Sequence, residues 1–113
     1  MGELTYLNLN CNILSGKGIR GILVLENLVF LNLGNNRISV IPDFAFAKMA
    51  KLNCLLLNHN KLEEITFVSI LSELNTLVLS NNQIKSIPAD AFKNLTKLRK
   101  LSLYELYYRV FNV

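Results

Sequence analysis

Leucine and isoleucine recur along this chain at places one, four, six and eleven of a pattern that also has an asparagine at place nine. One full copy consists of Leu28, Leu31, Leu33, Asn36 and Ile38. Copies start at residues 4, 28, 52, 74 and 98, so their spacing is 24, 24, 22 and 24 residues. The fifth copy fails at its ninth place, where Leu106 replaces asparagine. Self-similarity at this period predicts a stack of similar structural units.

The alternation within each copy predicts a short β-strand. It places the fourth and sixth residues on one face and the third, fifth and seventh on the other. One repeat cannot bury its leucine face alone, so we expect the strands to stack in parallel, about 4.8 Å apart, with the other residues returning along the opposite side. The asparagines at place nine then form one inward structural column, in which side-chain amides satisfy buried backbone groups. This asparagine ladder comprises Asn12, Asn36, Asn60 and Asn82.

The pattern resembles L-x-x-L-x-L-x-x-N-x-L, the signature of leucine-rich repeat proteins, over about residues 4 to 106. The resemblance implies an α/β fold class, a leucine-rich-repeat solenoid that curves as a right-handed superhelix. Its parallel β-sheet would line the concave face, with short helices, 3-10 turns and loops on the convex face. We expect a single domain over residues 1–113, in which residues 104–113 are either a C-terminal cap or a truncated tail.

The return segments resemble three classes of the family. Gly18-Ile19 is similar to the start of the short helices of ribonuclease-inhibitor-like repeats. Residues 41–49 and 87–95 are similar to the I-P-x-x-A-F-x-x-L return of extracellular members such as Toll-like receptors and small proteoglycans. The shorter third return, residues 62–71, is similar to the 22-residue repeats of intracellular phosphatase-regulator proteins. This mixture leaves the cellular compartment open.

Composition and cysteine content weakly favour the cytoplasm for a complete chain. Hydrophobic residues make up 51% of the sequence, yet no apolar run reaches the roughly 18 residues of a membrane-spanning helix. The N-terminus lacks the features of a secretory signal. Cys11 and Cys54 are two repeats apart, beyond disulfide reach, so we predict two free thiols, which fit a reducing compartment. If the chain is a fragment of a larger receptor, we expect an extracellular location.

The sequence offers no constellation for catalysis, a metal ion or a cofactor. Cys11 and His59 share place eight but lie two repeats apart, about 10 Å, whereas a catalytic pair must be within about 3 Å. One histidine and two distant cysteines do not form a zinc site. The glycines of Gly16 to Gly21 match G-x-G-x-x-G, but the repeat register already accounts for this segment. We therefore predict a protein that is not an enzyme.

Charge gives a weak indication of partners. The formal net charge is +4, and a cluster of Lys93, Lys97, Arg99 and Lys100 could attract an acidic partner or a phosphate backbone. The simpler interpretation is a solvated turn, so we do not expect nucleic acid to bind. Asn94-Leu95-Thr96 matches an N-glycosylation acceptor, which matters only if the parent protein is secreted.

The remaining surface predicts a protein-protein interaction module. On the concave face, the repeat register gathers an apolar patch of Tyr6, Phe30, Cys54, Leu56 and Val78, and polar contacts of Asn8, Asn32, Asn58 and His59. Contiguous exposed apolar surface usually marks an interaction site, although such residues also favour strands for packing alone. The alternative function is an internal fragment of a larger extracellular leucine-rich-repeat receptor or matrix protein, acting as a structural spacer. Self-association through the N-terminal edge strand or the C-terminal tail is also left open.

Overall fold

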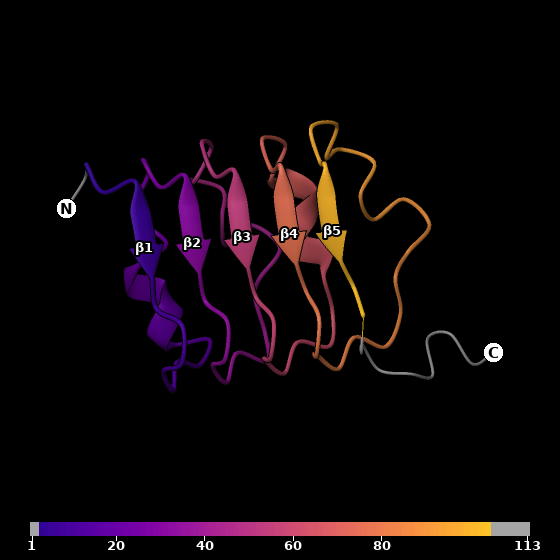
Figure 1. Cartoon of the computed structure of the whole chain (residues 1–113), viewed down its shortest axis with the longest axis horizontal. Coiled ribbons are helices and arrows are strands. Elements are labelled where there is room, and N and C mark those ends of the chain that lie inside the picture. Colours follow the sequence, from indigo (N-terminus) through magenta and orange to yellow (C-terminus); the bar gives the residue numbers. More distant parts are fainter. Residues whose placement is uncertain (1–2, 105–113) are drawn as a thin grey trace.

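The computed structural model describes residues 3–104. In this part of the chain, five strands of three residues each form one parallel sheet in sequence order (Figure 1). The strands are β1 (Tyr6–Asn8), β2 (Phe30–Asn32), β3 (Cys54–Leu56), β4 (Thr76–Val78) and β5 (Lys100–Ser102). Each strand covers places three to five of its repeat, and equivalent places pair, as Leu31 does with Leu55. The predicted strands, their parallel order and their register are therefore confirmed.

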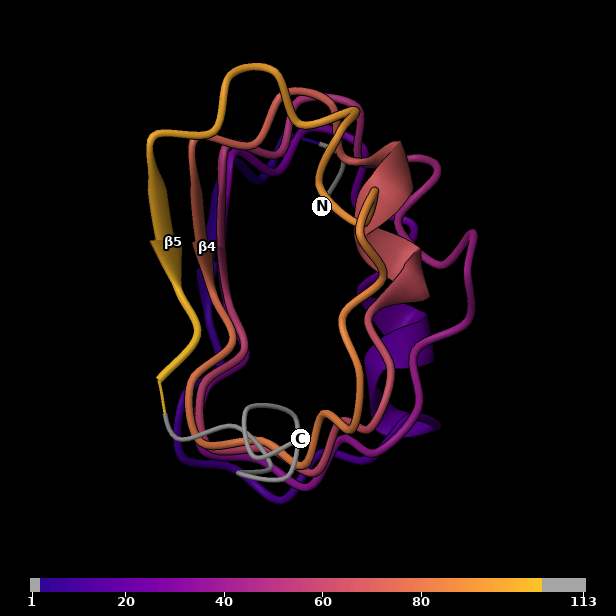
Figure 2. The same ribbon diagram turned by 90° about the vertical axis from the view of Figure 1, so that its right-hand side faces the viewer.

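The return segments lie opposite the sheet and close each turn of the solenoid (Figure 2). The first and third contain 3-10 helices, η1 (Gly18–Gly21) and η2 (Thr66–Ile70), while the second and fourth contain turns. The two proline-containing returns each contain the same type of hydrogen bond. The backbone N–H of Ala45 donates to the carbonyl of Pro42, and that of Ala91 donates to the carbonyl of Pro88, both at 3.0 Å. Within residues 3–104, the helical turns of the convex side are thus only of the 3-10 type. None of the helices in this part of the chain has the length and hydropathy needed to cross a membrane.

The leucine and isoleucine places of the pattern make the core. In the second, third and fourth repeats, the residues at places one, four, six and eleven are at most 1% exposed. Those of the terminal repeats are only partly buried, and Leu101 is 37% exposed. Because a repeat buries its apolar face against both neighbours, the repeats at either end of the described stack are less well covered. Residues 105–113, for which we predict a cap or a truncated tail, lie outside the described part.

Two phenylalanines fill the space between the sheet and the returns. Phe46 and Phe67 are 1% and 0% exposed, with ring centroids 5.7 Å apart and planes inclined at 57°. Phe46 occupies the phenylalanine place of the I-P-x-x-A-F return. Phe67 was not assigned to the core from the sequence, because the apolar spacing of the third return selects Ile65 and Val68 instead. The η2 helix turns Phe67 and Val68 inward, and Ile65 is buried directly before it.

The ladder asparagines bridge adjacent repeats. Asn60, 7% exposed, donates from Nδ2 to the carbonyls of Leu33 and Leu57, while its Oδ1 accepts the N–H of Ile38 at 3.0 Å. Asn36 and Asn82 make the equivalent bonds, each to its own repeat and to the preceding one. Asn12 differs, because it is exposed and its Nδ2 donates only within its own repeat, to Leu9 O at 2.8 Å and Asn10 O at 3.4 Å.

Place eight of each complete repeat adopts the left-handed backbone conformation. Its occupants have φ angles between 55° and 61° and are Cys11, Asn35, His59 and Asn81. Asparagine and histidine are several-fold enriched in this region, whereas most side chains there are strained by their Cβ atom. Cys11 is therefore the residue least suited to its backbone in this column.

We expect Cys11→Asn to raise the free energy of unfolding, by up to about 1 kcal/mol, because asparagine relieves part of the left-handed strain. Urea denaturation followed by circular dichroism measures the change. Cys11→Ala is the matched control, since it removes the thiol but keeps a Cβ atom in the same conformation. Equal stability of the two variants would contradict the explanation.

Candidate protein-binding surface

Two stacked aromatic rings stand on the open face of the sheet. Tyr6 and Phe30 occupy place three of β1 and β2 and are paired in the parallel register. Their ring centroids are 4.3 Å apart and their planes differ by 6°. Tyr6 is 57% exposed and Phe30 is half-buried. The in-register strands thus hold a flat apolar platform toward solvent.

The other apolar residues of the expected patch continue this platform across β3 and β4. Cys54 lies beside Phe30 in the register, and Leu56 lies beside Val78. The side chains of Cys54, Leu56 and Val78 are half-buried. Burial raises the pKa of the Cys54 thiol, and the nearby Lys100 ammonium partly opposes this shift. The thiol is therefore held neutral near pH 7 and suits an apolar surface.

Polar side chains edge the platform where β1 to β3 end. Asn8 and Asn32 each accept a backbone N–H two residues further on, at 3.0 and 2.9 Å. Asn58 is half-buried, and His59 is exposed in the turn after β3. The structure therefore brings all four polar candidates to the same end of the sheet, but it ties Asn8 and Asn32 partly to their own turns.

An asparagine cluster around Gly34 was missed by the sequence analysis. A Cβ atom on this glycine would lie 2.8 Å from Asn58 Oδ1, 3.0 Å from Asn10 Oδ1 and 3.1 Å from Asn32 Oδ1. In addition, Asn35 donates from Nδ2 to Asn10 Oδ1 at 3.0 Å. The sequence carried a signal for this cluster. Place seven is glycine in the second repeat (Gly34) and asparagine in the first and third repeats (Asn10 and Asn58). The cluster adds Asn10 to the candidate surface.

The residues considered for catalysis, metal binding or nucleotide binding are not brought together. Cys11 and His59 follow β1 and β3, with the turn of Asn35 between them. Both cysteines are free, as predicted. Among residues 3–104, no three His, Cys, Asp or Glu side chains are grouped closely enough to hold a metal ion. The G-x-G-x-x-G segment lies on the convex side, where a Cβ on Gly18 would be 2.9 Å from the Leu14 side chain.

The basic cluster is divided between two faces of the molecule. Lys100 belongs to β5 in the sheet, whereas Lys93 lies in the fourth return and contacts Asp90 at 3.7 Å. Lys97 pairs with Glu73 of the preceding repeat at 2.8 Å. These surface pairs contribute little stability, but they place a carboxylate beside Lys93 and another beside Lys97. A continuous strip for a phosphate backbone is therefore not favoured.

Comparison with known proteins places this geometry in a family. A family model for the leucine rich repeat matches residues 2–62 and 61–105. The osteomodulin of Rattus norvegicus is 49% identical over 41 residues, and that of Bos taurus is 45% identical over 42 residues. These stretches are 36% and 37% of this chain but only 10% of each relative.

Solved structures show the same solenoid. The leucine-rich repeat domain of APL1B superposes with a TM-score of 0.83 at 24% identity, over 92% of this chain and 31% of that one. An internalin (inlF) from Listeria monocytogenes gives a TM-score of 0.80 at 32% identity, over 91% of this chain and 28% of that one. This family is in general a non-enzymatic interaction fold. Because the two family-model matches together span nearly the whole sequence, the chain belongs to the leucine-rich repeat family.

Proposed function

We propose that this chain is a non-catalytic module that binds a protein partner through the concave face of its sheet. The observation that carries the proposal is the stacked Tyr6–Phe30 pair, whose rings lie 4.3 Å apart on the open face. Aromatic residues are enriched in protein interfaces because they bury much area with little loss of side-chain freedom. Their stacking further limits that loss, because each ring already restrains the other.

The surroundings of the stack support a protein as the ligand. Cys54, Leu56 and Val78 extend the apolar platform, while Asn58 and His59 lie at its edge. An apolar centre with a polar rim is the usual anatomy of a protein interface. Carboxamides both donate and accept, so the asparagine cluster around Gly34 can pair with backbone groups of a partner.

We expect Phe30→Ser combined with Leu56→Ser to weaken partner binding at least about tenfold, the effect of losing one or two interface anchors. Wild type and variant are used for affinity capture from an extract of cells that express the chain, and bound proteins are quantified by mass spectrometry. Circular dichroism verifies that both fold, since these half-buried side chains lie outside the core.

The matched control for this experiment is Val24→Ser combined with Phe44→Ser. Both residues are exposed on the return side, at 58% and 77%. A partner of the concave face is lost with the first variant and kept with the control. Capture that survives the sheet substitutions but not the control would place binding on the convex side and refute the proposal.

A second candidate function is a spacer within a larger extracellular receptor or matrix protein. Its specific support is the similarity to osteomodulins, which are extracellular matrix proteins, together with the I-P-x-x-A-F returns. In that case the repeats hold other segments at a fixed separation. The sheet variant would then leave partner binding by the longer protein unchanged. The same similarity favours an extracellular compartment over the cytoplasm.

A further inference from the structure

The convex side carries a hollow of about 270 Å³ where three returns meet. Phe44 of the second return forms part of its wall, Thr66 and Ser69 of η2 lie in the middle, and the fourth return supplies Asp90 and Asn94. The Phe44 side chain is 77% exposed. The hollow thus combines an uncovered aromatic ring with hydroxyl, carboxylate and amide groups, and it lies on the opposite side from the proposed protein-binding surface.

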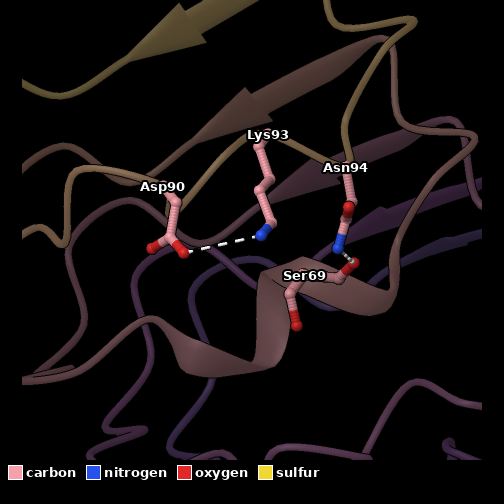
Figure 3. Close-up of polar contacts among 4 residues, drawn as sticks. All are labelled: Ser69, Asp90, Lys93 and Asn94. Carbon is pink, nitrogen blue, oxygen red and sulfur yellow. Dashed lines mark hydrogen bonds and ion pairs between the residues drawn. The ribbon is translucent and has the colours of Figure 1, made fainter.

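Asn94 lines this hollow, and its side chain points toward Ser69 of η2 (Figure 3). Its Nδ2 donates to the backbone carbonyl of Ser69 at 3.3 Å, while Asp90 contacts Lys93 beside it. Asn94 begins the only Asn-x-Ser/Thr triplet of the sequence. In the fold, Leu95 is 5% exposed and anchors the triplet, whereas Asn94 and Thr96 on either side are exposed. Both residues that define a glycosylation acceptor are therefore solvent-exposed.

The surroundings of Asn94 suit a saccharide. A pyranose ring has an apolar C–H face, which packs against an aromatic ring, and a rim of hydroxyl groups, which need hydrogen-bond partners. Phe44 offers the aromatic face. The Asp90 carboxylate is 68% exposed and 3.7 Å from Lys93, so it retains the capacity to accept hydroxyl protons.

We propose that Asn94 carries an N-linked glycan whose first sugars lie in the hollow against Phe44. In the transfer, Nδ2 of Asn94 attacks the anomeric carbon of a polyprenyl-diphosphate-linked oligosaccharide in the secretory pathway. The bond from this carbon to the phosphate oxygen breaks, the polyprenyl diphosphate leaves with the electron pair, and Nδ2 loses one proton. One N–H remains on Nδ2, so Asn94 keeps a donor for the Ser69 carbonyl.

Attachment is tested on the full chain, given an added secretion signal and secreted from cultured eukaryotic cells. We expect N-glycosidase F to reduce the mass of the wild type and to leave aspartate at position 94. Thr96→Ser keeps the acceptor hydroxyl and should remain modified, whereas Thr96→Ala and Asn94→Gln should be secreted without the modification. An unmodified Asn94 in secreted wild type overturns the proposal and leaves the concave binding surface unaffected.

The seat of the glycan is tested by thermal unfolding of the glycosylated and the enzyme-treated chains. Removal should lower the Tm by about 2–4 °C, the shift that about half a kcal/mol produces in a domain of this size. Phe44→Ala should abolish this difference. Val40→Ala, at a residue 66% exposed outside the hollow, should retain it, and the new aspartate is common to both variants. Equal shifts in the two variants would show that the glycan does not rest on Phe44.

Discussion

Replacing Asn60 with alanine should lower the free energy of unfolding by roughly 3 kcal/mol or more. The side chain satisfies the N–H of Ile38 and two carbonyl groups, from Leu33 and Leu57. All of these lie in the interior, and each buried polar group left without a partner costs about 1–3 kcal/mol. Since total stabilities of domains are about 5–15 kcal/mol, the variant should unfold at a much lower urea concentration.

The matched control is Asn12→Ala, which removes the same side chain from the same place of the first repeat. Asn12 is exposed and bonds only within its repeat, so water can replace the lost partners. We expect this change to cost less than about 1 kcal/mol. If Asn60→Ala proves equally mild, the ladder does not hold adjacent repeats together in the way the hydrogen bonds indicate.

Replacing Phe67 with alanine should destabilise the chain by about 3–5 kcal/mol, the usual cost of truncating a buried phenylalanine. Its ring is 0% exposed and contacts Phe46 across the core. The cavity would lie beneath η2, and the packed residues around such a cavity relax only in part. Urea denaturation monitored by circular dichroism measures the loss.

Phe44→Ala provides the comparison, because this ring is 77% exposed. Its truncation in unglycosylated protein should change stability by less than about 0.5 kcal/mol, as for most surface substitutions. A small effect at Phe67 would mean that the third return packs loosely and that the repeat is held mainly by its leucines. A large effect at Phe44 would mean that this ring contributes to the core.

The repeat, its register and the parallel sheet could all be predicted from the sequence. Places one, four, six and eleven must be apolar in every unit, because each unit can bury its leucines only against equivalent leucines of its neighbours. A periodic requirement of this kind is visible in a single sequence. It also assigned the residues of the open face, since side chains alternate strictly along a strand. Tyr6, Phe30, Leu56 and Val78 therefore lie where the alternation puts them.

The features that could not be predicted from the sequence are local and do not recur in every repeat. Phe67 is buried because η2 rotates it inward, although the return has no spacing that selects it. Place seven carried a signal for the asparagine cluster around Gly34, but Asn32 joins the cluster from place five, and only packing brings side chains of three repeats to one glycine. The basic residues near the fourth return are close in sequence, yet Lys100 lies in the sheet and Lys93 lies on the convex side. The hollow that places Asn94 near Phe44 joins residues about 50 positions apart. Spacing along a chain predicts what every repeat shares, whereas contacts between unlike returns depend on their three-dimensional packing.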